Sequence, residues 1–245
     1  DTKGVTESLM TASYQAEESE VSFPQVFSRF AHTYFQKYGN KSEILARIAA
    51  KNHKNSVHNP LAQMQKDVGF EFCNTISDKN PLVASPLRLT DCSLVSDGAA
   101  ALVMVSDELE ENFGNSVKFR SAVQVNDFLP MSSRDILKFE GPAKAFSDAY
   151  KEAGITLDDV DFAEVHDCFT IAELLVYEAM GLTKLGQGDR AILDGTVYSD
   201  GILPVNLSGG LKAKGHPVGA TGVSMHALTS AQLTGQAGAM QKKNA

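Results

Sequence analysis

GGLKAKGHPVGATG, residues Gly209–Gly222, is the stretch from which the fold and chemistry of this chain can be predicted. It holds five of the 19 glycines in the sequence and one histidine, His216, between Gly215 and Pro217. Glycine lets a substrate approach the main chain closely, and proline restricts the residue before it to an extended conformation. Together they would fix the direction of the His216 imidazole, a group suited to general acid–base catalysis near neutral pH. The alternative is a glycine-rich turn with an incidental histidine.

A second stretch, EVHDCFT at Glu164–Thr170, precedes the glycine stretch. The string GHPVGATG after GGLKAK resembles the histidine motif of thiolases, in which this histidine activates a nucleophilic cysteine. EVHDCFT resembles the HDCF motif of sterol-carrier-protein-type thiolases, where most other thiolases carry NEAF. The two motifs occur in the order of the family, and the resemblance covers about Phe23 to Met240.

EVHDCFT is the first motif in chain order, and two of its side chains, His166 and Cys168, are candidates for one pocket. They lie two residues apart, between a predicted strand and the predicted helix Ile171–Met180, so both would face the same side. The positive end of the helix would lower the pKa of Cys168 and make it an acid–base group, whereas a lone cysteine is more often an inert buried side chain. Asp167 would point away from this pocket and serve the structure. Phe169 would either line an acyl or pantetheine channel or belong to the core.

The resemblance implies an acyl-transfer mechanism. A cysteine nucleophile activated by His216 would take an acyl group from a 3-ketoacyl-CoA. Cys168 would handle the proton at the substrate α-carbon, and His166 with His216 would stabilise the enolate or oxyanion. Coenzyme A thioesters are then substrates, and no cofactor is expected. By its position Ser93 matches a family serine near the pantetheine arm, with a turn or cap serine as the alternative, and Gly219 is expected beside the substrate.

The sequence departs from the family in its nucleophile. Thiolases carry the nucleophilic cysteine in an N-terminal domain, before the region that matches Asp1, and neither Cys73 nor Cys92 lies in a similar motif. The glycine-rich segment at the family's C-terminal end is also not found before Ala245. We therefore expect a fragment of a longer protein that does not perform acyl transfer alone. Two other functions stay open: a thiolase-fold aldolase of steroid side-chain degradation, and a non-catalytic acyl-CoA-binding protein of the same fold.

Composition restricts the function further. The 245 residues are 43% hydrophobic and 21% charged, which is typical of a soluble globular protein. The net charge of −8 argues against binding of nucleic acid, and no apolar run reaches the roughly 20 residues of a membrane span. The three cysteines and six histidines show no metal-binding spacing, and the cysteines favour a reducing compartment. The resemblance implies a homodimer or dimer of dimers, in the cytoplasm of a prokaryote or in the peroxisomes or mitochondria of a eukaryote.

Helix and strand patterns alternate along the chain, which predicts an α/β fold with a mixed or parallel sheet. The predicted helices are Pro24–Tyr38, Ser42–Asn52, Gly141–Gly154, Ile171–Met180 and Val223–Leu233. The predicted strands are Ala100–Val105, Val117–Val125 and Phe162–Val165, with Gly195–Val205 extended. A basic run at Lys51–His58 is either a solvated face or a contact for a coenzyme A phosphate.

The resemblance also implies the five-layer thiolase fold, here partly covered. Residues 1–90 would form a helical segment like the loop domain of the family. Residues 91–112 would form the closing strand segment of the N-terminal domain, and residues 113–245 an incomplete C-terminal domain.

Overall fold

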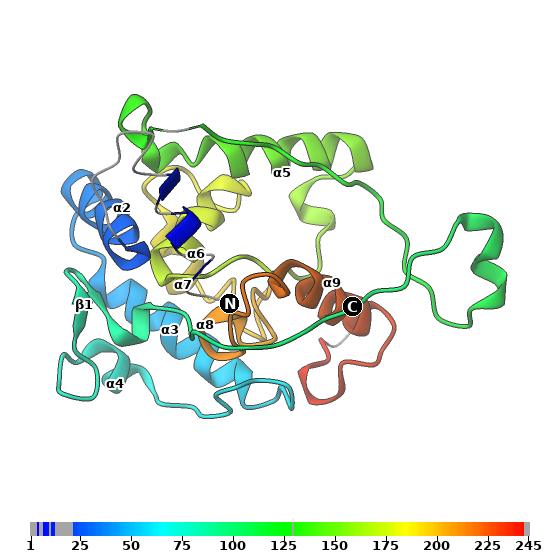
Figure 1. The fold of residues 1–245 in the computed structure, drawn as a ribbon, viewed down its shortest axis with the longest axis horizontal. Coiled ribbons are helices and arrows are strands. Elements are labelled where there is room, and N and C mark those ends of the chain that lie inside the picture. Colours follow the sequence, from blue (N-terminus) through cyan, green and yellow to red (C-terminus); the bar gives the residue numbers. More distant parts are fainter. Residues whose placement is uncertain (1–3, 5–6, 10, 13–21, 129, 243–245) are drawn as a thin grey trace.

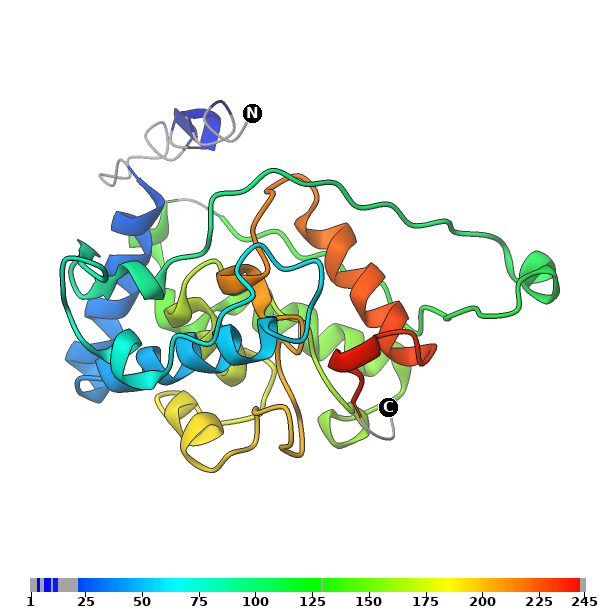
Figure 2. The same ribbon diagram turned by 90° about the horizontal axis from the view of Figure 1, so that it is seen from below.

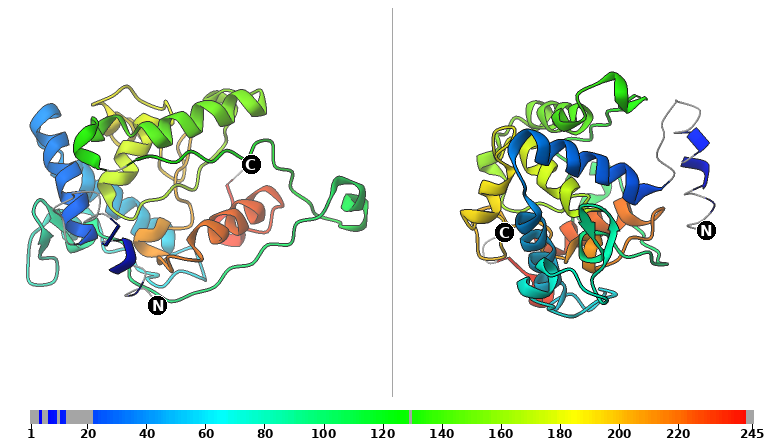
Figure 3. Two further views of the ribbon diagram at one scale, coloured as in Figure 1. Left: turned by 45° about the horizontal axis from the view of Figure 1, so that its top comes forward. Right: turned by 90° about the vertical axis from the view of Figure 1, so that its left-hand side faces the viewer.

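Helix α6 (Thr170–Ala179) lies at the centre of this computed structural model, which describes residues 4, 7–9, 11–12, 22–128 and 130–242. Its sequence, TIAELLVYEA, is apolar on most sides, and every residue except Ala179 is buried. A helix of this kind belongs in a core. It packs against helices α2 (Phe23–Tyr38), α3 (Ser42–Ser56), α5 (Glu140–Ala153) and α7 (Gly188–Leu193). Figures 1 and 3 show α5 on one side of α6 and α3 on the other.

The remaining elements are shorter or peripheral. They are α4 (Phe70–Asn74), α8 (Gly210–Ala213), α9 (Thr221–Leu233), β1 (Leu82–Ala84) and β2 (Leu87–Arg88). Turns of 3-10 helix occur at η1 (Leu89–Asp91), η2 (Asp107–Asn112), η3 (Met131–Ser133), η4 (Ile136–Lys138), η5 (Leu157–Asp159) and η6 (Gly238–Met240). Strands β1 and β2 pair antiparallel, with Leu82 opposite Arg88 and Ala84 opposite Leu87.

The main core gathers around α6. Its largest fully buried apolar side chains include Tyr34, Leu45, Ile48, Ile171, Leu174, Leu175 and Tyr177. These side chains come from α2, α3 and α6, so the three helices form the body of the molecule. None of the described helices is long and apolar enough to span a membrane.

All five helices predicted from periodicity are present, and α2 illustrates why. Ser22 caps its first turn by accepting a hydrogen bond from the Gln25 N–H at 3.4 Å. Pro24 fits the first turn, where no backbone donor is needed. Gly39 ends the helix with a φ of 84°, a conformation that favours glycine. Local signals were therefore sufficient for this element.

Helix α3 runs on to Ser56, past its predicted end, and its polar face is buried. Lys51 is 1% exposed and His53 is 2% exposed. The Lys51 ammonium donates to the Val205 carbonyl at 2.6 Å and pairs with the Glu173 carboxylate of α6 at 2.8 Å. The interpretation of this basic run as a solvated face is wrong for Lys51 and His53, because segments distant in sequence enclose them.

The predicted sheet is not formed within the described residues. The segments Ala100–Val105 and Val117–Val125 contain no strand, and with η2 between them they form an arm, residues 100–125. The arm projects from the body of the molecule (Figures 1 and 2). Most of its apolar side chains are solvent-exposed, for example 87% for Val103 and 76% for Met104. A strand needs a partner for its backbone N–H and C=O groups, and no strand of the described chain lies beside the arm.

Candidate active site

The two motifs lie side by side because the segments leading into them are paired. The Ala163 N–H donates to the Pro204 carbonyl at 2.9 Å, and the Asn206 N–H donates to the Ala163 carbonyl at 2.8 Å. The Asn206 side-chain oxygen then accepts from the Val165 N–H at 2.8 Å. The strand predicted at 162–165 is reduced to one parallel bridge between Ala163 and Val205. This pairing fixes the position of the first motif relative to the second.

Two carboxylates continue the connection. The Glu164 carboxylate accepts hydrogen bonds from the Ser208 N–H at 2.9 Å and from the Ser208 hydroxyl at 2.5 Å. The Asp167 carboxylate accepts from the Leu211 N–H at 2.7 Å and from the Lys212 N–H at 3.2 Å. Asp167 is only 1% exposed, so its side chain points into the protein. The two N–H groups that bond to Asp167 belong to α8, a helical turn at the start of the glycine stretch that was not predicted.

His166 and His216 meet beside these segments. Their ring centroids are 5.1 Å apart and their planes are 83° apart, an edge-to-face arrangement. The backbone N–H of His216 donates to the Ser96 hydroxyl oxygen at 2.8 Å, and a parallel β-bridge joins Val95 to His216. The structure thus brings together two of the predicted catalytic side chains, one from each motif.

A hydrogen bond to Thr221 orients the ring of His216. The His216 Nδ1 atom lies 2.7 Å from the Thr221 hydroxyl oxygen. That hydroxyl also lies 3.1 Å from the Pro217 carbonyl. If it donates to this carbonyl, it accepts from a protonated Nδ1 and the lone pair of the neutral ring is on Nε2; if it donates to Nδ1, the proton of the ring is on Nε2. Burial, the neighbouring His166 ring and the Lys214 ammonium lower the pKa of His216 to about 4, so the neutral base is the form present at pH 7.

Part of the His166 side chain is in contact with solvent, but protein atoms surround much of its ring. This loss of surrounding water lowers the pKa of His166, and the nearby Lys214 ammonium lowers it further. Lys214 is 7% exposed and donates to the Ser224 hydroxyl at 2.8 Å. The Lys214 ammonium therefore acts on both imidazoles and favours their neutral forms. Each neutral imidazole can donate one hydrogen bond and accept another.

Cys168 lies directly before the N-cap residue of α6 and is 9% exposed. Burial and the Asp167 carboxylate raise the pKa of its thiol, although the backbone N–H groups of Phe169 and of Cys168 itself act in the opposite direction. The prediction of a low-pKa thiol is wrong, because burial outweighs the helix N-terminus. The structure instead gives a neutral thiol, which can donate a proton but is not a ready nucleophile.

The predicted substrate contacts divide into three cases. Ser93 is adjacent to the site, because its N–H donates to the Cys168 carbonyl at 2.8 Å. Phe169 is 5% exposed and stacks on Phe27 with ring centroids 4.5 Å apart, so it belongs to the core, the second of its two alternatives. Gly219 is exposed in the turn between α8 and α9. Its role toward a substrate stays a prediction.

None of the three cysteines of the chain is an activated thiol. Burial raises the pKa of Cys73 to about 11 and that of Cys92 to about 12, in the same direction as for Cys168. Across the described residues, no three histidine, cysteine, aspartate or glutamate side chains converge as a metal site.

Two important contacts of His216 were not predicted from the sequence. Thr221 lies within the glycine stretch, and helix α9 begins there, so the start of a helix after the turn was a usable local signal. Ser96 is 120 residues away from His216 in sequence, and no local pattern indicates this contact.

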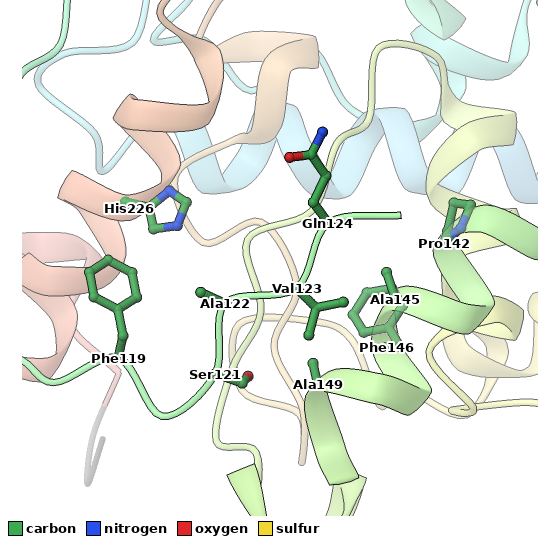
Figure 4. A pocket seen from close by; sticks show the side chains of 10 residues that line it. All are labelled: Phe119, Ser121, Ala122, Val123, Gln124, Pro142, Ala145, Phe146, Ala149 and His226. Atoms are coloured by element: carbon green, nitrogen blue, oxygen red, sulfur yellow. The ribbon is translucent and has the colours of Figure 1, made fainter. Parts of the chain in front are cut away.

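A groove separate from the histidine pair lies between the arm, α5 and α9 (Figure 4). Its volume is about 560 Å³, and its walls include Phe119, Val123, Phe146 and His226. None of the predicted site residues lines it, and His226 is its sole titratable lining residue. The groove is therefore distinct from the site predicted from the two motifs.

Comparisons with known proteins agree with the two motifs. Residues 124–245 match the family described as thiolase C-terminal domain-like. The acetyl-CoA acetyltransferase of Methanothermobacter thermautotrophicus is 38% identical over 244 residues, which cover 98% of this chain and 63% of that protein. Human sterol carrier protein 2 is 37% identical over 226 residues, which cover 89% of this chain and 40% of that protein. The chain thus spans less than two thirds of the length of these relatives.

Two solved structures have a similar fold. The Ltp2-ChsH2(DUF35) aldolase matches with a TM-score of 0.78 at 23% identity, covering 89% of this chain and 57% of that chain. A monomeric SCP2-thiolase like protein from Mycobacterium smegmatis matches with a TM-score of 0.60 at 20% identity, covering 85% and 44%. At these identities the likeness concerns the fold alone. The motifs, the family match and the relatives together show that this chain belongs to the thiolase superfamily, with acetyl-CoA acetyltransferases and sterol carrier protein 2 as homologues.

Proposed function

We propose that this chain is part of an acyl-CoA thiolase, which cleaves a 3-ketoacyl-CoA with free coenzyme A or performs the reverse Claisen condensation. The observation that carries the proposal is the pair of imidazoles, His166 and His216, one from each motif, with ring centroids 5.1 Å apart. The relatives named as acetyl-CoA acetyltransferases support the same reaction class.

His216 is the general base in this proposal. Its Nε2 lone pair takes the proton of a cysteine thiol, and the thiolate attacks the ketone carbonyl of the 3-ketoacyl-CoA. None of Cys73, Cys92 and Cys168 is an activated thiol. The nucleophile is therefore proposed to lie in the part of the longer relatives that this chain does not span.

Carbon–carbon cleavage would release acetyl- or propionyl-CoA as its enolate, which needs a proton at the α-carbon. The neutral thiol of Cys168 is the proposed donor. The His166 ring donates a hydrogen bond to the thioester oxygen, where the negative charge of the enolate develops. The thiol of free coenzyme A then accepts the acyl group from the cysteine, so coenzyme A is a substrate and no cofactor is proposed.

The wider assignments belong to the same proposal. Ser93 and Gly219 would contact the pantetheine arm. The chain would contribute a loop-domain-like segment (1–90), a closing strand of the N-terminal domain (91–112) and most of a C-terminal domain (113–245) to a five-layer fold. The longer protein would be a homodimer or dimer of dimers. It would be cytoplasmic in a prokaryote, and peroxisomal or mitochondrial in a eukaryote.

A thiolase-fold aldolase of steroid side-chain degradation is the second candidate. The similarity in fold to the Ltp2-ChsH2(DUF35) aldolase supports this candidate. Such an aldolase does not depend on a cysteine nucleophile. A non-catalytic acyl-CoA-binding role is the third. The residue that faces His216 in the longer protein separates these candidates: a cysteine supports the thiolase, and a tyrosine or another residue supports the aldolase or the binding protein.

The test is thiolysis by the longer protein with short, medium and branched 3-ketoacyl-CoA substrates and free coenzyme A. We expect turnover, and we expect His216→Ala to lower kcat by about 100-fold or more, since general base catalysis contributes on this scale. His226→Ala is the matched control, because His226 is an exposed histidine of α9 that packs on Phe119 at 5.8 Å. Absence of thiolysis with every substrate, or equal losses in the two variants, would contradict the proposal.

A further inference from the structure

Asp167 lies between His166 and Cys168 in sequence, but its carboxylate faces the interior. It accepts hydrogen bonds from the Leu211 N–H at 2.7 Å and from the Lys212 N–H at 3.2 Å. A third donor, the Asn52 side-chain amide of α3, lies 2.8 Å away. The three donors come from two segments that are distant from Asp167 in sequence. This carboxylate therefore joins the first motif to both α3 and the glycine stretch.

The glycine stretch approaches Asp167 so closely that a side chain would not fit. A Cβ atom added to Gly210 would lie 2.2 Å from the Asp167 Oδ2 atom. Gly210 also has a φ of +58°, a conformation that other residues rarely adopt. The absence of a side chain at this position is thus what allows the carboxylate to reach the backbone of α8.

Asp167 is connected to both histidines through few residues. His166 is its neighbour in sequence. On the other side, the helical turn α8 contains Leu211 and Lys212 and ends three residues before His216, with the Lys214 N–H donating to the Gly210 carbonyl at 2.8 Å. A displacement of the carboxylate would move the backbone of both segments whose rings meet 5.1 Å apart.

The carboxylate is itself held by a buried network. The Asn52 amide also donates to the Glu173 carboxylate of α6 at 2.6 Å, and Glu173 pairs with the Lys51 ammonium at 2.8 Å. All four side chains are at most 1% exposed. Hydrogen bonds among buried polar groups are strong and well defined in direction, so this network can hold Asp167 at one position.

We propose that Asp167 is a positioning residue, which sets the separation and angle of the His166 and His216 rings by clamping α8 against the first motif. The importance of Asp167 for catalysis rests on the proposed function, but its effect on the geometry of the two rings does not. The competing explanation is that Asp167 contributes to stability only, as many buried aspartates do.

The test compares Asp167→Asn with Asp91→Asn in the 245-residue chain. Asp91 is a matched control, because it is 0% exposed and bonds to Arg88 and Thr170 but not to the glycine stretch. In Asp167→Asn we expect amide hydrogen exchange at Leu211 and Lys212 to accelerate about tenfold or more, since one of the two accepting oxygens is replaced by an NH2 group that cannot accept a hydrogen bond. We also expect loss of the nuclear Overhauser contact between the His166 and His216 rings. In Asp91→Asn both signals should persist.

Gly210→Ala gives an independent measurement if Asp167→Asn does not fold. The added methyl group would displace the carboxylate and weaken the ring contact, and it should do so less in an Asp167→Ala background, where the clash is absent. An unchanged ring contact in Asp167→Asn or in Gly210→Ala, or an equal loss in Asp91→Asn, overturns the proposal. The readouts need no substrate, so missing thiolysis in the longer protein would sink the proposed function and leave this proposal standing.

Discussion

At the scale of single residues, the hydroxyl group of Thr221 contacts the Nδ1 atom of His216 at 2.7 Å and lies 3.1 Å from the Pro217 carbonyl. A hydroxyl that donates to this carbonyl accepts the Nδ1 proton and leaves the lone pair of the ring on Nε2, which is the arrangement that the proposed general base needs. The orientation of a catalytic imidazole commonly depends on such a partner.

Thr221→Val tests this role, since valine has the same shape but no hydroxyl. We expect the fraction of His216 protonated at Nδ1 to fall, as read from the ¹⁵N chemical shifts of the ring. In the longer protein kcat should fall by about 10- to 100-fold, since the base is no longer held in the right tautomer.

Thr234→Val is the control for this measurement. Thr234 lies at the other end of α9 and donates to the Ser230 carbonyl at 2.9 Å, so it also loses one hydroxyl bond. If the ring nitrogens of His216 respond equally to both changes, or to neither, Thr221 does not set the tautomer.

The sequence predicted which histidines lie together better than it predicted the chemical state of Cys168. His166 and His216 come together as their motifs imply. The thiol of Cys168 has a raised pKa, because the degree of burial depends on segments that no local pattern identifies. Ser96 illustrates the same limit, since it contacts His216 across 120 residues of sequence.

At the scale of elements, α3 is unusual in burying a polar face. Burial and the nearby Lys212 ammonium lower the pKa of His53 to about 4, and its Nδ1 atom has no hydrogen-bond partner. The folded protein therefore keeps this ring neutral at pH values where an unfolded chain would protonate it.

This difference predicts a dependence of stability on pH. Between about pH 6.5 and pH 4 the unfolded chain binds a proton at His53 that the folded chain does not, so stability falls as pH falls through this window. The contribution amounts to about 3 kcal/mol across the whole window. Urea unfolding at several pH values should show a smaller loss for His53→Gln than for the natural sequence.

The comparison between variants is essential, because other groups titrate in the opposite sense. Burial raises the pKa of Glu164 and of Asp167, so each contributes stability at low pH that is lost as pH rises. His58→Gln is the control, since His58 is exposed just beyond the end of α3. Equal pH profiles for His53→Gln and the natural sequence would contradict the assignment.

Helices were predictable and strands were not, for one physical reason. The signals of α2 and α5, such as Pro24, Gly39 and Gly154, act within a few residues. A strand is completed by hydrogen bonds to another strand, and Ala100–Val105 has no such partner in the described chain. Short turns such as α8 were missed because four residues carry no periodicity.

At the scale of the whole molecule, the arm and the body differ in packing. Lys118 and Arg120 lie exposed in the arm, whereas segments on either side of the arm are joined through buried bonds such as that of Lys51 to Val205. We expect brief treatment with trypsin to cut first at Lys118 or Arg120, because extended and exposed backbone is the preferred substrate of proteases. Mass spectrometry identifies the cut.

The two products of this cut should stay together on a size-exclusion column. Lys118→Gln combined with Arg120→Gln should delay the first cut, while Lys54→Gln, a change at an exposed site of α3, should not. A first cut within the body, or separation of the two products without denaturant, would show that the arm is not the least protected part of the chain.

The long sequence separations around the site also have a consequence for the order of events during protein synthesis. The Lys51 ammonium finds its acceptor at Val205, 154 residues later, and the Asn52 amide finds Asp167, 115 residues later. Helix α3 therefore leaves the ribosome well before the groups that bury its polar face have been made. A ribosome that stalls before Glu173 would release an α3 whose Lys51 lacks both the carboxylate of Glu173 and the carbonyl of Val205.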